Sequence, residues 1–110
     1  MSKVDSRTWT TAEAGAALAK SGADYVTLFS QGTLEIEIYR PVGVDRQQPH
    51  GKDELYVVIA GTGTFVHAGK STPFQPGDTL FVRAGVPHRF EDFSADFATW
   101  VFFWGPEGGE

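Results

Sequence analysis

Residues 48–61 read QPHGKDELYVVIAG and carry His50, one of three histidines in the chain, together with Glu54. Side chains two apart on an extended chain point to the same face. If the stretch is extended, apart from a small irregularity between the histidine and the glutamate, then Gln48, His50 and Glu54 share one face of a sheet. A second histidine, His88, lies further along the chain and must come from a neighbouring strand. The sequence therefore predicts that polar side chains from two strands converge.

This set of side chains suits a metal ion. A first-row divalent ion prefers imidazole nitrogen and carboxylate oxygen at about 2.0 to 2.2 Å, and two histidines with one carboxylate leave positions open for a substrate. The chain has no cysteine, so thiolate ligands are excluded. We predict one divalent ion, Fe, Zn, Mn or Ni, held by Gln48, His50, Glu54 and His88.

With these residues in register, the chain resembles the cupin superfamily over about residues 34–104. The first motif of that family, G-x5-H-x-H-x3-4-E-x6-G, is matched by Gly43, Gln48, His50, Glu54 and Gly61. The second motif, G-x5-P-x-G-x2-H-x3-N, is matched by Gly77, Gly85, His88 and Asp92. The resemblance implies a small jelly-roll barrel with the metal inside.

Three positions depart from the family pattern. Gln48 stands where the family has its first metal-binding histidine, and Arg83 and Asp92 replace the proline and the asparagine of the second motif. A glutamine amide oxygen can ligate a metal, but as a neutral donor it is weaker than imidazole. The alternative for Gln48 is to orient a bound water or a substrate beside the metal ligands.

Composition indicates a single domain of 110 residues and 12.0 kDa with a net charge of -5. We expect a helical segment over residues 1–23, a β-barrel over 24–104 and a loose tail over 105–110. Lysines and arginines are scattered rather than clustered, which argues against a nucleic-acid partner. The chain has neither an apolar signal segment nor a run long enough to span a membrane, so we expect a soluble, cytoplasmic protein without a membrane partner.

The element pattern predicts an all-β fold with one short helix. A capping box at Thr10 and Glu13 predicts a helix over about residues 11–20. From Asp24 onward the hydrophobic period is two, and turn signals recur at short intervals. Strands are expected at 34–39, 54–60, 62–67, 79–83, 87–92 and 97–104.

Two strands are apolar on both faces and predict a homodimer. Residues 97–104 read FATWVFFW, and Leu55, Val57 and Ile59 extend the apolar character of the neighbouring stretch. One face of each strand lines the barrel, so the other needs cover from the helix or from a second subunit. The helix is short and alanine-rich, which favours the second subunit.

The expected ligand is a small molecule in the barrel. Hydroxyl groups of Tyr39, Tyr56 and Thr99 and apolar walls of Val58, Phe90 and Val101 are the predicted pocket residues. No catalytic acid or base is assigned.

Three kinds of function remain open for this site. We favour a metal-dependent enzyme that acts on a small chelating polar substrate, with dioxygenase-like chemistry ahead of an isomerase or lyase. Sugar-phosphate isomerisation would need a cationic patch that the sequence does not supply near the motifs. The alternative from another class is a non-catalytic module that binds or senses a small molecule.

Overall fold

The computed structural model describes residues 5–110, so residues 1–4 of the predicted N-terminal segment lie outside the described residues. The described part of the chain contains one helix and eight strands. They are α1 (Thr11–Ser21), β1 (Tyr25–Gln31), β2 (Leu34–Tyr39), β3 (Asp53–Ala60), β4 (Gly63–His67), β5 (Lys70–Phe74), β6 (Thr79–Val82), β7 (His88–Glu91) and β8 (Ala98–Trp104).

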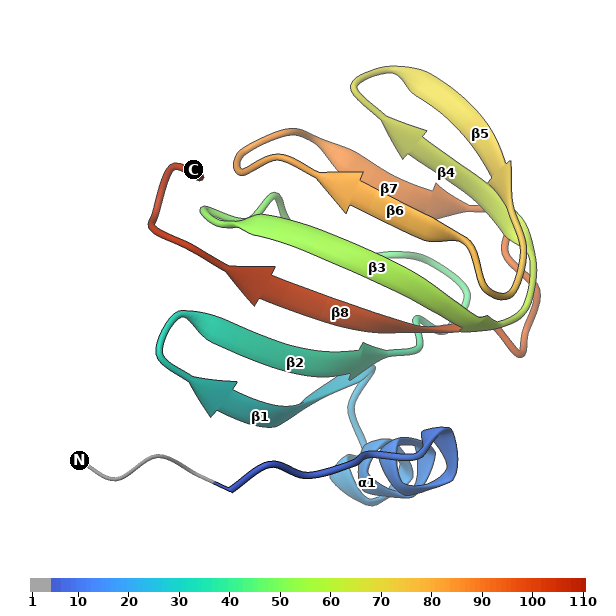
Figure 1. Cartoon of the computed structure of the whole chain (residues 1–110). Helices are drawn as coiled ribbons and strands as arrows, with labels where there is room; N and C mark the ends of the chain where they lie inside the picture. Colours follow the sequence, from blue (N-terminus) through green and yellow to red (C-terminus); the bar gives the residue numbers. More distant parts are fainter. Residues whose placement is uncertain (1–4) are drawn as a thin grey trace.

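The strands form two antiparallel sheets that face each other (Figure 1). The larger sheet has the order β1-β2-β8-β3-β6 and the smaller sheet the order β5-β4-β7. The β1–β2 and β4–β5 pairs join consecutive strands, whereas the β2–β8 and β3–β8 pairs join strands far apart in sequence. The predicted all-β jelly-roll fold with a short N-terminal helix is confirmed. Strand β5 was not predicted, because its sequence KSTPF is mostly exposed and lacks apolar alternation.

Helix α1 lies at the β1–β2 end of the larger sheet (Figure 1). The capping box is formed, since the Glu13 backbone N–H donates to Thr10 Oγ1 at 3.1 Å. The helix ends one residue later than expected, before Gly22 in the left-handed conformation (φ 69°). Its buried residues Ala14 and Leu18 pack on Ile38 of β2. The described residues contain no helix with the length and hydropathy of a membrane span.

The face of strand β2 that carries Glu37 and Tyr39 turns toward the inside of the fold. Ile38 turns outward beneath the helix, while Tyr39 belongs to the core between the sheets. Glu37 is paired with Val101 of β8 and shares the inward face with Tyr39. The alternation in the sequence predicted a half-buried strand correctly, and the helix determines which face turns inward.

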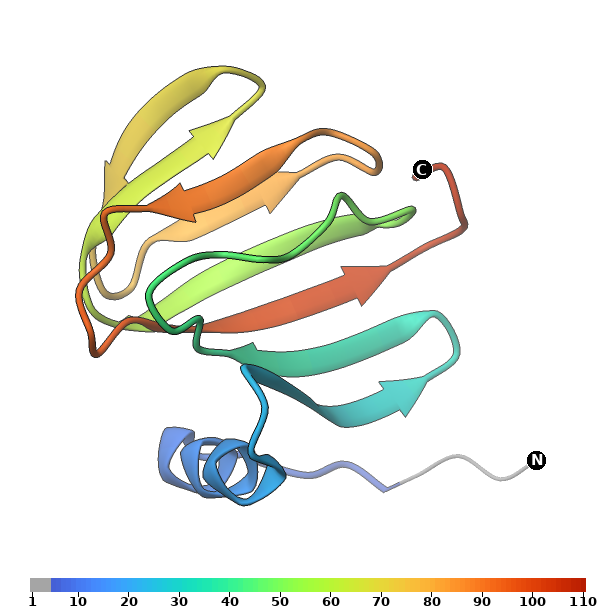
Figure 2. The same cartoon turned by 180° about the vertical axis from the view of Figure 1, so that it is seen from behind.

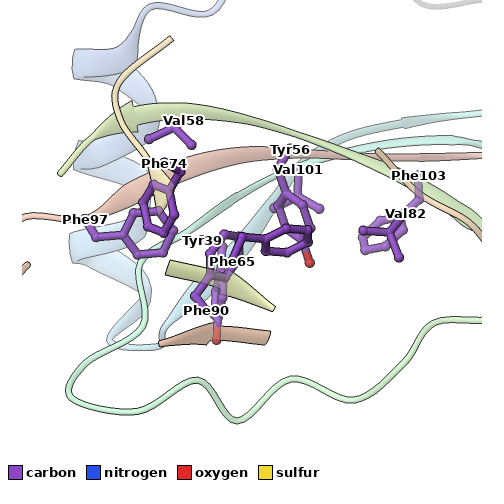
Figure 3. Close-up of a cluster of buried hydrophobic side chains, with 10 residues drawn as sticks. All are labelled: Tyr39, Tyr56, Val58, Phe65, Phe74, Val82, Phe90, Phe97, Val101 and Phe103. Carbon is purple, nitrogen blue, oxygen red and sulfur yellow. The ribbon is translucent and has the colours of Figure 1, made fainter. Parts of the chain in front are cut away.

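The core between the sheets is built from aromatic rings (Figure 3). Phe90 lies at its centre, with ring centroids 4.7 Å from Phe97, 4.9 Å from Tyr56 and 5.1 Å from Phe65. The core cluster consists of Tyr39, Tyr56, Val58, Phe65, Phe74, Val82, Phe90, Phe97, Val101 and Phe103. Burial of these side chains is the main term that holds the two sheets together.

The connection over residues 40–52 links β2 to β3 outside any strand. Figure 2 shows it crossing the face of the larger sheet, in green, below β7 and β6. The backbone N–H of Gly85 donates to the His50 carbonyl at 2.7 Å, which ties this connection to the β6–β7 turn. Gly85 has a φ of 78°, as expected for a turn glycine.

The tail over residues 105–110 folds back on the start of β3. The backbone N–H of Glu110 donates to Asp53 at 3.1 Å, and that of Gly108 donates to the Gly51 carbonyl at 2.6 Å. These hydrogen bonds tie the tail, which the sequence predicted to be loose, to the start of β3. The backbone N–H of Ala84 also donates to Asp53 at 2.9 Å. The hydrogen bond from Ala84 is the largest cause that lowers the pKa of the Asp53 carboxyl group, and the hydrogen bond from Glu110 is the next.

An apolar face of the larger sheet lies beyond the reach of the helix. The helix cluster includes Trp100 and Ile59, whereas Leu55, Phe81 and Phe102 form a separate row across β3, β6 and β8. Phe81 is 50% exposed. We propose that a second copy of the chain covers this row as a homodimer.

The dimer is expected as a species of twice 12.0 kDa in light scattering at micromolar concentration. Phe81→Asp places a charge on the apolar row and should convert the dimer to monomer. Val42→Asp, at a position that is 69% exposed elsewhere, serves as the matched control. A wild-type protein that is monomeric at that concentration would contradict the prediction.

Candidate metal centre and cavity

Glu54 and His88 meet in the interior of the fold. Glu54 lies on β3 and His88 begins β7, so the two sheets each contribute one side chain. Glu54 Oε1 is 2.8 Å from His88 Nε2, and both side chains are 1% exposed. The structure thus brings together one residue from each sequence motif.

Two further contacts orient the His88 ring. Nδ1 lies 2.8 Å from the Val86 carbonyl oxygen and Nε2 lies 3.0 Å from the Tyr56 hydroxyl. A carbonyl oxygen only accepts, so Nδ1 carries a hydrogen and Nε2 faces Tyr56 and Glu54. Burial lowers the pKa of His88, but the hydrogen bonds to Glu54 and Val86 outweigh burial and raise it. The site favours positive charge at this ring.

The chemistry of this pair fits a divalent cation. Glu54 Oε2 is buried without a hydrogen-bond partner among the described residues, which is costly for a carboxylate oxygen. Carboxylate oxygen and imidazole nitrogen are ligands of first-row ions. A cation held by the Glu54 carboxylate and by His88 Nε2 would give Glu54 Oε2 the partner that it lacks.

A cavity of about 370 Å³ is lined by residues of β8, the strand next to β3, but not by Glu54 or His88 themselves. Val101 and Phe103 line it, and these residues are the β8 partners of Tyr56 and Glu54. The remaining lining residues are Asp24, Tyr25, Glu37, Tyr39, Arg46, Gln47, Gln48 and His50. The cavity can hold a small polar molecule.

His50 and Gln48 lie on the cavity wall rather than next to Glu54 and His88. The His50 ring packs on Phe103, with 4.5 Å between ring centroids, and Gln48 is exposed. Within residues 5–110, no group of three or more His, Cys, Asp or Glu side chains is placed to hold a metal ion. Residues 48–50 lie outside any strand, and residues 51–52 form the expected irregularity before β3. The role of His50 and Gln48 as metal ligands stays a prediction.

The structure adds Asp45 and Gln47 to this region, which the sequence did not single out. Gln47 Oε1 accepts from the Tyr56 hydroxyl at 2.7 Å, and Asp45 accepts from the Tyr39 hydroxyl at 2.5 Å. Burial is the main cause that raises the pKa of both tyrosine hydroxyls, and neighbouring carboxylates raise it further. Both tyrosines therefore keep their protons. Both polar residues lie in the irregular connection, where no strand period marks the inward side.

Glu37 is a second residue that the sequence did not single out. It lines the cavity and accepts from Thr27 Oγ1 at 3.3 Å. Burial raises the pKa of Glu37 above its usual range, and the charges of Glu35 and Glu54 add to this, while the Thr27 bond opposes it. A half-buried carboxyl group with a raised pKa can accept or donate a proton in the cavity.

The predicted pocket residues separate into three groups. Tyr39 and Val101 line the cavity. Val58, Phe90 and Thr99 are at most 3% exposed and fill the core, where Thr99 Oγ1 donates to the Trp100 carbonyl at 2.9 Å. Tyr56 is fully buried and contacts His88 instead.

Three polar residues lie outside the centre. Arg83 and Asp92, which depart from the second motif, are both exposed, and Asp92 lies in a loop. His67 of β4 is the strand partner of His88, and its ring stacks on Phe65 with 6.1 Å between centroids.

Comparison with known proteins identifies the family. Residues 35–104 match the family described as the Cupin domain, which is well over half of the chain. An uncharacterised protein of Streptomyces coelicolor is 32% identical over 91 residues, which cover 81% of this chain and 86% of the relative. This chain belongs to the cupin family, and the resemblance predicted from its two motifs is confirmed.

Solved structures share the fold at lower identity. DMSP lyase DddQ of Ruegeria pomeroyi superposes with a TM-score of 0.65 at 23% identity, over 74% of this chain and 46% of that one. KdgF of Halomonas sp. gives 0.63 at 15% identity, over 74% and 78%. A cupin 2 conserved barrel domain protein of Salinispora arenicola gives 0.62 at 20% identity, over 74% of each chain. This chain spans less than half of the Ruegeria protein, and these likenesses show the fold alone.

Proposed function

We propose that this cupin is a metal-dependent enzyme that acts on a small polar substrate able to chelate the ion. The observation that carries the proposal is the buried Glu54–His88 pair, whose unpartnered Oε2 atom and 2.8 Å contact fit a divalent cation. Glu54 and His88 would hold the ion, with His50 and Gln48 as the further predicted ligands. When bound, the ion supplies Lewis-acid or oxygen-binding chemistry.

The residues of the cavity bind and shield the substrate. Val101 and Phe103 form an apolar wall, and Tyr39 and Gln47 present polar atoms on the same cavity. The apolar wall excludes water from the reacting atoms. Dioxygenase-like chemistry remains the first candidate, since a bidentate oxygen-donor substrate matches a site that leaves positions open.

A lyase or isomerase is the second candidate, and Glu37 is the observation that favours it. These reactions need a group that moves a proton, and Glu37 has the raised pKa and the position on the cavity for that role. DMSP lyase DddQ, which shares the fold, is a lyase by name. Glu37 would take a proton from substrate carbon or return one.

Oxygen uptake and product formation distinguish the candidates. The protein is loaded with Fe, Mn, Ni or Zn and screened with diketones, ortho-hydroxy ketones and hydroxy acids. Dioxygen consumption only when substrate is present indicates the oxygenase, and product without oxygen uptake indicates the lyase or isomerase. Tight ligand binding without product in every metal form would contradict the enzyme proposal and leave a binding module.

Glu37→Gln sharpens this test. The amide keeps the shape and the bond to Thr27 but cannot exchange a proton, so a lyase or isomerase should lose about a hundredfold in kcat. Glu35→Gln removes the same charge from the same face of β2. An equal loss in both variants would mean that the charge, and not proton transfer by Glu37, matters.

A further inference from the structure

Asp45 joins three parts of the fold through one carboxylate. Its Oδ1 accepts from the Tyr39 hydroxyl at 2.5 Å and from the Gln47 backbone N–H at 3.0 Å. Its Oδ2 accepts from Gln47 Nε2 at 2.9 Å and from the Phe90 backbone N–H at 2.8 Å. A carboxylate has about four acceptor positions. All four are used, so Asp45 fixes the 40–52 connection against β2 and β7.

This arrangement determines how the Gln47 amide is turned. Because a carboxylate only accepts, the NH2 group of Gln47 must face Asp45. Its carbonyl oxygen Oε1 therefore points the other way, where it lies 2.7 Å from the Tyr56 hydroxyl. A carbonyl oxygen has no hydrogen to give, so the single hydroxyl proton of Tyr56 is donated to Gln47.

The direction of the Tyr56 proton matters at the Glu54–His88 pair. Nε2 of His88 lies 3.0 Å from the Tyr56 oxygen and 2.8 Å from Glu54 Oε1. A carboxylate oxygen only accepts, so Nε2 carries a hydrogen toward Glu54 and cannot accept from Tyr56. The acceptor within reach of a Tyr56 proton is therefore the Glu54 carboxylate, whose Oε2 is left without a partner. We propose that Gln47, oriented by Asp45, is a positioning residue that draws the Tyr56 proton away from the Glu54–His88 pair and leaves the Glu54 carboxylate free to take a divalent cation. The inference rests on the proposed metal function.

Loss of the Gln47 carbonyl reverses this direction. Leucine has a similar size but no acceptor, so in Gln47→Leu the buried Tyr56 hydroxyl turns its proton to the Glu54 carboxylate. Glu54 is a candidate metal ligand, so an ion must then break a buried hydrogen bond before it binds. The effect of replacing Gln47 on metal affinity should therefore depend on whether the Tyr56 hydroxyl is present.

A double-mutant cycle on divalent-ion affinity tests this coupling. Calorimetry with Zn²⁺ and Ni²⁺ should show a Kd about tenfold weaker for Gln47→Leu. Tyr56→Phe alone should change the Kd little, and Gln47→Leu/Tyr56→Phe should return it close to the wild-type value. Gln31→Leu, at an exposed position of β1, is the matched control for the same substitution.

The outcomes separate a positioning role from a structural one. If Gln47 only holds the loop in place, the double variant should bind as weakly as Gln47→Leu or more weakly, which overturns the inference. Unchanged affinity in Gln47→Leu overturns it as well. Failure of the wild-type protein to bind either ion would instead count against the proposed function.

A measurement on the metal-free wild-type protein decides the orientation by itself. The Gln47 side-chain NH2 and the Phe90 backbone N–H both donate to Oδ2 of Asp45, so their hydrogens should give a nuclear Overhauser contact. A contact between the Gln47 NH2 hydrogens and the Tyr56 ring in its place would show the amide reversed. That result would overturn the inference whatever the metal titrations show.

Discussion

Replacing His88 by alanine is expected to abolish the binding of divalent metal ions. His88 Nε2 and Glu54 Oε1 lie 2.8 Å apart in a site where both side chains are 1% exposed. Removal of the ring deletes one of the two buried metal ligands, so the affinity for divalent ions should fall by roughly a hundredfold or more. Elemental analysis of protein purified without chelator, together with calorimetry, measures the loss. His50→Ala is expected to have the same direction of effect if the ring leaves the cavity wall to bind the ion.

His67→Ala is the matched control for this prediction. His67 is the strand partner of His88, but its ring stacks on Phe65 and it falls outside both sequence motifs. The variant should keep about one metal ion per chain. Equal metal content in the wild type and in His88→Ala would refute the assignment of the centre, and a loss in His67→Ala would add that residue to the ligands.

The fold was largely predictable because its signals are local. The capping box at Thr10 marks the helix, the period of two marks β2, and a continuous apolar run marks β8. The side of β2 that turns inward was not predictable, since alternation is the same for either choice. The helix buries Ile38, and this turns Glu37 toward the cavity. A raised pKa at Glu37 is thus a consequence of packing between elements distant in the sequence.

Only those residues of the candidate site that lie on strands could be predicted from the sequence. Glu54 and His88 lie on β3 and β7, and the two motifs indicated that they meet. Residues 40–52 lie outside any strand, so counting by two is no guide there and overlooked Gln47, the neighbour of Gln48. Asp45 was overlooked for the same reason, as its four hydrogen bonds come from β2, β7 and its own connection. Such contacts depend on the path of an irregular segment and leave no period in the sequence.

Phe90→Ala is expected to remove much of the stability of the fold. Phe90 is 2% exposed, and its ring centroid lies within 5.5 Å of four aromatic neighbours: Tyr56, Phe65, Phe74 and Phe97 (Figure 3). Loss of a buried phenylalanine leaves a cavity and costs about 3–5 kcal/mol in the free energy of unfolding. For a domain of this size that lowers the melting temperature by about 15 °C or more.

The same variant tests whether Phe90 belongs to the core or to a substrate pocket. The sequence predicted it as an apolar pocket wall, whereas the structure buries it in the core between the two sheets, and it does not line the cavity. Thermal unfolding followed by circular dichroism measures the change, with Tyr25→Ala as the control because that aromatic side chain is 54% exposed. Tyr25→Ala should shift the unfolding free energy by less than about 1 kcal/mol. If Phe90→Ala unfolds near the wild-type temperature but binds larger ligands, Phe90 is a pocket wall and the packed core does not depend on it.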